Sequence, residues 1–272
     1  MKLAFTTLAC PNWSLEQIID AAQRNGYEGL EIRLLNGEIL PADLDEATRS
    51  RVYSQCAAAD LKIVCVDTSI KIATQDSEGR AAQIRDGMAY LQMADEWGAP
   101  FIRVFGGTPE GTPKADAIKV STECLTTLAK RGQELGVKVL LETHDAFSSS
   151  IMVMEVLNQV PEAGALWDTL HPYRVGEQPA ETATRLGDRC DHVHIKDGRR
   201  ANGEQWDLTL LGEGEVPVPA MLSILHAQGY DGWLSVEWEK KWHPEIAEPE
   251  IAIPQHAEVL RKYLAGIGQL AI

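Results

Sequence analysis

The sequence has few cysteines and contains no long apolar run. Its five cysteines include no CxxC pair, so we expect neither a disulfide framework nor a zinc site built from thiolates. No apolar run reaches the roughly 18 residues of a membrane span, and the apolar start of the chain is too short for a secretory signal. These absences favour a cytoplasmic protein that does not insert into membranes.

Basic residues are also fewer than acidic ones. Lysine and arginine number 25 against 40 aspartates and glutamates, which gives a formal net charge of -15. Such a charge repels nucleic acids and anionic membranes, because binding to phosphates depends on clustered basic side chains. No GxGxxG or GxxxxGK motif follows the first expected strand, which disfavours a dinucleotide-binding fold. The partner we expect is a small, weakly charged molecule and not a nucleic acid.

Short apolar runs alternate with helical patterns along the whole chain. A helix opens with Ser14, whose side chain and that of Gln17 are suited to cap each other's free amides. The expected strands lie at 3–6, 29–33, 63–67, 101–105, 139–142, in an apolar run ending at Asp168, and at 192–196 and 233–237. Segments 69–79, 197–217 and 238–254 are expected to be loops. Eight strand-helix units in 272 residues predict an α/β protein with one (β/α)8 TIM barrel domain over residues 1–272.

Four polar residues stand at the ends of the last four expected strands. Glu142 ends VLLE, Asp168 ends ALWD, His194 lies in HVHIKD, and Glu237 ends WLSVEWE. Because strand ends meet at one mouth of such a barrel, these side chains should converge. Three carboxylates and an imidazole would repel one another there without a cation. We therefore predict one divalent metal ion, with Mn first and Mg, Co or Zn as alternatives, because the ligands are rich in oxygen.

This pattern resembles the xylose isomerase-like TIM barrels, the superfamily of sugar isomerases and epimerases. The superfamily includes ketose 3-epimerases, hydroxypyruvate isomerase, inosose dehydratase and inosose isomerase. The resemblance extends over nearly the whole chain, from GLEIR through IRVFGG to LLGEGEVP and SVEWE. It implies a divalent cation held by the four residues at the strand ends, and it suggests a homodimer or homotetramer.

The resemblance also implies substrate contacts. His171 lies three residues after Asp168 and Arg200 lies six residues after His194, the spacings at which ketose 3-epimerases contact substrate. Ser148 departs from the pattern, because the epimerases have a second substrate-binding Glu at that position. The HIKD segment is closer to the inosose-type members, which puts a free ketose in doubt as substrate.

The chemistry we expect is proton transfer next to a carbonyl of a sugar or keto-sugar, through a metal-stabilised enediolate. Glu142 and Glu237 are the expected proton-transfer pair, because they come from well-separated strands. A metal-dependent lyase or dehydratase acting on an inosose or keto-glycoside would share the first step. Endonuclease IV shares the barrel but uses three zinc ions with histidines on early strands, whereas the first histidine here is His144. A sugar-binding barrel without catalysis would need no such pair.

Other residues near the expected mouth have two readings. His144 is expected to contact substrate at the mouth. Lys196 is expected to contact substrate too. A salt bridge across the mouth that involves Lys196 or Asp197 is an equally good interpretation of these two residues. His192 is expected to pack behind the barrel, facing away from His194.

Local explanations compete elsewhere as well. Glu31 and Arg33 fit a simple loop cap or ion pair about as well as a functional role, and the Trp238 and Trp242 loop fits a cover for the core better than a sugar platform. Arg199 and Arg200 would suit a phosphate site after the seventh strand. Against this, the same loop carries four acidic residues, Glu204, Asp207, Glu213 and Glu215.

Overall fold

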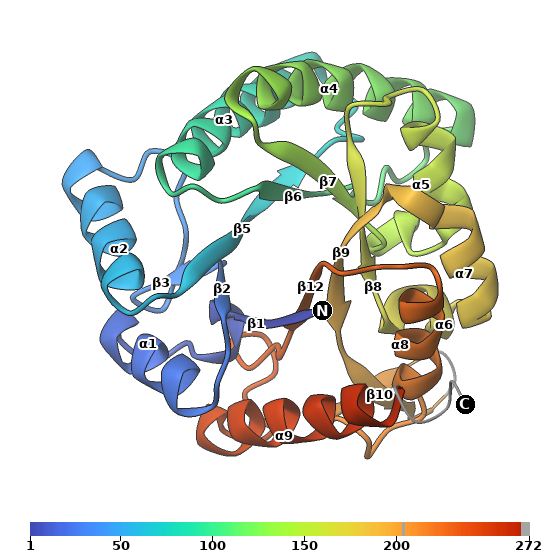
Figure 1. The fold of residues 1–272 in the computed structure, drawn as a ribbon. Helices are drawn as coiled ribbons and strands as arrows, with labels where there is room; N and C mark the ends of the chain where they lie inside the picture. The colour runs from blue at the N-terminus through green and yellow to red at the C-terminus, as the bar shows by residue number, and fades with distance from the viewer. Residues whose placement is uncertain (203–204, 268–272) are drawn as a thin grey trace.

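A closed barrel of eight parallel strands forms the centre of the protein (Figure 1). The structure is a computed structural model and describes residues 1–202 and 205–267. Around the barrel the strands follow chain order, and β1 pairs with both β2 and β12. They are β1 (Lys2–Thr6), β2 (Gly29–Ile32), β5 (Lys62–Lys71), β6 (Phe101–Phe105), β7 (Lys138–Glu142), β8 (Gly164–Asp168), β9 (Cys190–Ile195) and β12 (Trp233–Val236). The predicted (β/α)8 barrel is confirmed.

Helices surround the barrel on the outside (Figure 1). They are α1 (Leu15–Arg24), α2 (Glu46–Ala58), α3 (Ser77–Glu96), α4 (Lys114–Leu135), α5 (Ser150–Leu157), α6 (Leu170–Arg174), α7 (Pro179–Leu186), α8 (Val218–Ala227) and α9 (Pro249–Ile267). The predicted capping pair begins α1, since the Gln17 amide donates to Ser14 Oγ at 3.3 Å and the Ser14 amide donates to Gln17 Oε1 at 2.8 Å. Ile18 and Ala22 of this helix are buried against the barrel wall.

Three expected loops contain regular structure that the sequence patterns did not reveal. Strand β5 continues to Lys71 and α3 already begins at Ser77, so the loop over 69–79 is mostly replaced by these elements. The 197–217 segment contains an antiparallel hairpin of β10 (Asp197–Arg200) and β11 (Trp206–Thr209). Glu204, one of its acidic residues, lies outside the described residues. Helix α9 starts at Pro249, a position where the missing N–H of proline costs no helical hydrogen bond, and it continues through Pro254.

Two short hairpins extend the barrel beyond the strand ends. Strands β3 (Leu34–Leu35) and β4 (Glu38–Ile39) follow β2, and the β10–β11 hairpin follows β9. Asp197 holds the second hairpin and its return loop in place. Its carboxylate accepts hydrogen bonds from the backbone amides of Gly198, Gly212, Gly214 and Val216, at 2.8 to 3.1 Å. Asp197 therefore shapes the loop, and it makes no salt bridge across the mouth with any residue in the described ranges.

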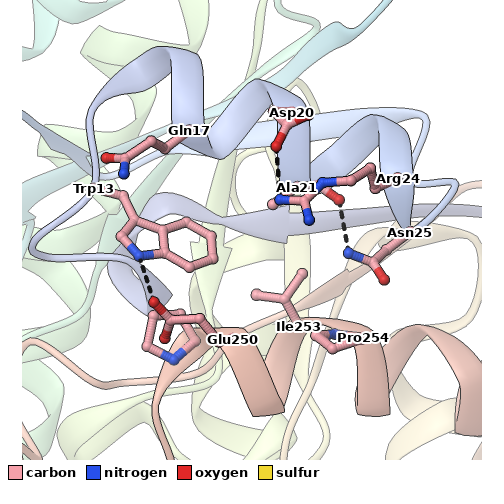
Figure 2. Close-up of a pocket in the computed structure, with 10 residues that line it drawn as sticks. Trp13, Gln17, Asp20, Ala21, Arg24, Asn25, Glu250, Ile253 and Pro254 are labelled. Carbon is pink, nitrogen blue, oxygen red and sulfur yellow. Dashed lines mark hydrogen bonds and ion pairs between the residues drawn. The ribbon is translucent and has the colours of Figure 1, made fainter.

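A groove on the outer wall lies between α1 and α9 and has a volume of about 400 Å³ (Figure 2). Its polar side chains bind one another: Trp13 Nε1 donates to Glu250 Oε1 at 3.3 Å, and Arg24 pairs with Asp20 at 2.6 Å. The groove is separate from the mouth where the strand ends meet. In the described ranges, no helix is both long and apolar enough to span a membrane.

Candidate metal centre

The four predicted ligands meet inside the mouth of the barrel. Each of Glu142, Asp168, His194 and Glu237 offers one ligand atom, and these atoms all lie within 4.8 Å of one another. Glu142 ends β7, Asp168 ends β8, His194 lies in β9 and Glu237 follows β12. The first three side chains are fully buried and Glu237 is 5% exposed. Parallel strands bring their carboxyl ends to one place, so residues far apart in the chain form a single cluster.

The atoms facing the centre of this cluster have few partners. Among the described residues, Glu142 Oε1 and His194 Nδ1 have no hydrogen-bond partner. Glu142 Oε2, Asp168 Oδ2 and Glu237 Oε2 are met only by the charged ends of Arg103 and Lys196. His194 Nδ1 lies 3.4 Å from both Glu142 Oε1 and Glu237 Oε2. Buried polar atoms without partners are costly, and three carboxylate oxygens with one imidazole nitrogen suit a divalent cation. The residues therefore fit the predicted metal ion.

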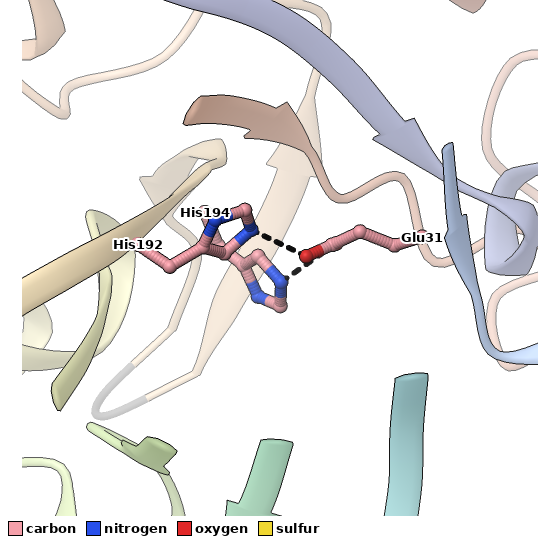
Figure 3. A group of neighbouring side chains, drawn as sticks. All are labelled: Glu31, His192 and His194. Atoms are coloured by element: carbon pink, nitrogen blue, oxygen red, sulfur yellow. Dashed lines mark hydrogen bonds and ion pairs between the residues drawn. The ribbon is translucent and has the colours of Figure 1, made fainter. Parts of the chain in front are cut away.

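Glu31 binds the far side of the His194 ring (Figure 3). Its Oε2 accepts a hydrogen bond from His194 Nε2 at 2.9 Å, and its Oε1 accepts one from His192 Nε2. Because an ionised carboxylate can only accept, Nε2 of His194 carries a proton, and Nδ1 is the ring atom that faces the cluster and could bind a cation after losing its own proton. Orientation of a ligating imidazole by a carboxylate is common in metal sites.

The prediction that His192 packs behind the barrel is wrong. Side chains two residues apart in a strand point to the same face, so His192 and His194 both point into the barrel, with ring centroids 5.8 Å apart. The interpretation of Glu31 and Arg33 as a local ion pair is also corrected, because each binds other residues. Glu31 pairs with the two histidines, whereas Arg33 donates to the Asp67 carbonyl and to Ser69 Oγ.

Arg103 is a buried cation beside the cluster that the sequence reading missed. Its Nε lies 3.2 Å from Glu142 Oε2, its Nη2 lies 3.7 Å from Asp67 Oδ2, and its guanidinium stacks on the Phe105 ring at 3.9 Å. The side chain is only 1% exposed. The IRVFGG segment carried a signal, because an arginine within an apolar strand needs a buried acid as partner.

Lys196 lies across the mouth and contacts three carboxylates. Its Nζ is 2.5 Å from Glu237 Oε2, 3.1 Å from Asp168 Oδ2 and 2.5 Å from Glu239 Oε1. The salt-bridge interpretation of Lys196 therefore describes its geometry, and its contact with substrate stays a prediction. Glu239, which sequence reasoning did not single out, stands two residues after Glu237 and on the outer side of Lys196.

The buried cations keep two of the carboxylates ionised. Burial raises the pKa of Glu142, but the nearby Arg103 and His194 outweigh it and hold that pKa below its usual value. At Glu237 the neighbouring Lys196 and His194 outweigh burial in the same way and hold the pKa well below its usual range. At Asp168 burial outweighs Lys196 and raises the pKa. Glu142 and Glu237 therefore stay ionised and are available as ligands for a cation.

The predicted substrate contacts lie on one side of the cluster. His171 Nε2 is 3.9 Å from Asp168 Oδ2, and its ring meets the His144 ring with centroids 4.4 Å apart. His144 Nδ1 lies 3.0 Å from Asp145 Oδ1. Arg200, in β10, is exposed and faces Trp206 with its guanidinium 5.6 Å from the ring centroid. The structure thus places His144 and His171 next to the cluster and Arg200 farther out.

The two tryptophans behave differently. Trp238 is 2% exposed and donates from Nε1 to the Ala247 carbonyl at 2.9 Å, so it covers the core. Trp242 is 46% exposed. Only the first of these therefore fits the reading of this loop as a cover.

Comparison with known proteins agrees with the fold. The model of the family described as xylose isomerase-like TIM barrel matches residues 19–263. Inosose isomerase of Halalkalibacterium halodurans is 24% identical over 269 residues, covering 92% of each chain. Inosose dehydratase of Lacticaseibacillus casei is 27% identical over 158 residues, covering 52% of this chain and 51% of the relative.

Among solved structures, a crystal structure of the IOLI protein with a bound zinc atom superposes with a TM-score of 0.82 at 20% identity. It covers 98% of both chains. The family match spans nearly the whole chain, and the described residues form the barrel that its description names. The protein belongs to the xylose isomerase-like TIM barrel family.

Proposed function

We propose that the protein is a divalent-metal-dependent isomerase or epimerase that acts on a sugar or keto-sugar. The observation that carries this proposal is the buried cluster of Glu142, Asp168, His194 and Glu237, whose ligand atoms lie within 4.8 Å of one another. The named relatives, an inosose isomerase and an inosose dehydratase, are enzymes of polyhydroxylated ring ketones. Mn, Mg, Co and Zn are all candidates for the ion.

A cation bound at these four residues would polarise a substrate carbonyl and make the hydrogen on the neighbouring carbon more acidic. Glu142 and Glu237 then move that proton. They stand on β7 and after β12, with β8 and β9 between them in the barrel, so they approach a bound molecule from different sides. One carboxylate takes the proton from carbon, and the other returns a proton on the opposite face, which inverts the centre. Return to the adjacent carbon instead gives the isomer.

The remaining side chains of the mouth position the reacting groups. Arg103 and Lys196 keep Glu142 and Glu237 ionised, as a base must be before it takes a proton. Burial lowers the pKa of His171 well below its usual value, so the imidazole is neutral and both donates and accepts hydrogen bonds. Together with His144, Lys196 and Arg200 it forms the set of groups that we assign to substrate binding.

The proposal is tested by measuring metal content and turnover together. We expect about one divalent ion per chain, loss of activity after treatment with a chelator, and recovery with Mn or Co. The substrate panel should contain inososes, free ketoses and keto-glycosides, with each product identified by NMR. Full activity in metal-free protein would contradict the proposal.

A metal-dependent lyase is the second candidate, and the match to an inosose dehydratase favours it. Elimination begins with the same proton transfer but expels a hydroxyl group, so the product is lighter by one water. Mass spectrometry of the product therefore separates the two. An endonuclease of the same barrel class is disfavoured by the net charge of -15, and failure to cut a duplex with an abasic site would remove it.

The partners in this proposal are a small carbohydrate and a second copy of the chain. We propose a homodimer or homotetramer, to be checked by light scattering of the purified protein.

A further inference from the structure

A cavity of about 730 Å³ opens among the segments that follow β7, β8 and β9. Its lining includes Asp145, Ser148, Arg174, Arg200 and Trp206. Asp145 follows β7, Arg174 ends α6 after β8, and Arg200 and Trp206 belong to the hairpin after β9. All of these segments follow the carboxyl ends of barrel strands, so the cavity lies at the same mouth as the cluster.

Two imidazoles connect the cavity to the cluster. His144 contacts Asp145 on the cavity side, with Nδ1 and Oδ1 3.0 Å apart. Its ring packs against the ring of His171, which in turn lies 3.9 Å from Asp168. The two rings therefore form a continuous chain of contacts from the cluster to the lining of the cavity.

The cavity carries an excess of positive charge. Arg174 and Arg200 make no ion pair with any carboxylate that the structure describes, whereas Arg103 and Arg185 both pair with acids. Asp145 is the acidic residue of the lining, and it is already bound to His144, with Lys71 and Arg174 also near enough to lower its pKa. Glu215 is close to Arg200 but accepts from its backbone amide, at 3.3 Å. Two guanidinium groups are therefore available in a protein of net charge -15.

The two neighbouring arginines of strand β10 make different contacts. Arg200 stacks toward Trp206, whose ring also meets the edge of Tyr173 at 5.9 Å. Arg199 instead donates to the Glu213 carbonyl at 3.0 Å and does not line the cavity. Aromatic support restricts the Arg200 side chain, which reduces the entropy lost when the guanidinium binds a ligand.

We propose that this cavity binds an anionic group of the substrate, a carboxylate or a phosphate, at the end remote from the reacting carbonyl. Arginine pairs suit both groups because the planar guanidinium donates two parallel hydrogen bonds to either. The volume lies within the range of about 300 to 1,000 Å³ usual for small-molecule sites. The inference rests on the proposed function. It replaces the expectation of a weakly charged substrate, because the positive charge of the cavity, and not the net charge of the protein, selects the substrate.

The test compares sugars that differ only at the remote end. D-Fructose, D-fructuronate and D-fructose 6-phosphate are titrated into the metal-loaded protein by calorimetry. We expect at least one anionic sugar to bind about 10-fold or more tightly than fructose, the scale of one added charged hydrogen bond. The carboxylate and phosphate arms show which anion fits. The double variant Arg174→Met and Arg200→Met should lose this preference, and Arg199→Met, which removes one charge from the same strand, should retain it.

Several results would overturn the inference. Equal affinity for the three sugars, or no measurable binding of either anionic sugar, excludes an anion site. A loss in Arg199→Met as large as in the double variant would mean that only net charge matters. Metal content and turnover of neutral sugars are measured in parallel, so the two proposals fail separately: metal-dependent turnover without anion preference ends this inference alone, and anion preference in a protein that needs no metal ends the proposed function alone.

Discussion

The carboxylate of Glu31 lies 2.9 Å from Nε2 of His194, on the side of the ring opposite the metal cluster. Both side chains are fully buried. The hydrogen bond fixes the proton on Nε2 and leaves Nδ1 facing Glu142 and Glu237. Glu31 thus sets the orientation and protonation of a proposed metal ligand without belonging to the ligand set.

Replacing Glu31 by Gln should weaken metal binding by about 10- to 100-fold, the range seen when such supporting groups are removed. The amide keeps the shape of the side chain, but its NH₂ group cannot accept the second imidazole proton. Metal affinity is measured by competition with a coloured chelator, and circular dichroism checks the fold. Glu28→Gln, at an exposed position one residue before the same strand, is the matched control. Equal affinities in the two variants would show that Glu31 does not act through His194.

His194→Ala and His192→Ala should differ in metal content although both histidines point into the barrel. Removal of His194 takes away a ligand atom of the cluster, so we expect loss of stoichiometric metal. Removal of His192 leaves the four ligands in place but deprives buried Glu31 of one partner. That variant should keep its metal and lose about 3 kcal/mol or more of stability, as broken buried pairs do. Metal analysis after dialysis and urea unfolding provide the two measurements, and equal metal loss would contradict this assignment.

Turnover in heavy water should place deuterium on the carbon next to the carbonyl, because a carboxylic acid exchanges its proton with solvent before returning it. Glu237→Gln should slow the reaction by about 100-fold or more, since the amide cannot carry a proton. Glu245→Gln, in the exposed part of the same loop, serves as the control. The label is detected by NMR of the product. An unlabelled product formed at full rate would indicate direct hydride transfer and leave the barrel and its metal intact.

The stability of the protein should fall as the pH drops from about 6.5 to 4, in part through His256. Burial lowers the pKa of this imidazole to about 4, and its Nδ1 lies 2.7 Å from the Ala252 carbonyl. Above pH 6.5 the His256 imidazole is neutral in both the folded and the unfolded protein. Between pH 6.5 and 4 it takes up a proton only in the unfolded chain, which favours unfolding. The full loss is about 3 kcal/mol. Urea unfolding should show a shallower pH dependence in His256→Gln than in wild type or in exposed His226→Gln. Identical slopes in all three proteins would exclude this role.

The sequence by itself determined the barrel and the four residues of the cluster. Alternating apolar runs and caps are local patterns, and a residue at the carboxyl end of a strand must face the mouth once the strands close into a barrel. Glu142, Asp168, His194 and Glu237 could therefore be grouped without knowledge of any contact. Their convergence followed from topology alone.

Only the tertiary structure decided what surrounds these ligands. Glu31 and His192 are 161 residues apart, and Arg103 of β6 meets Glu142 of β7 and Asp67 of β5. The hairpin that carries Arg200 depends on the Asp197 carboxylate and four backbone amides from a later loop. Such pairings leave no periodic signal in the chain, because they depend on which side chains the closed barrel brings to the same depth. Burial makes each of these pairings necessary, because a charged side chain without a partner inside the barrel would strongly destabilise the folded protein.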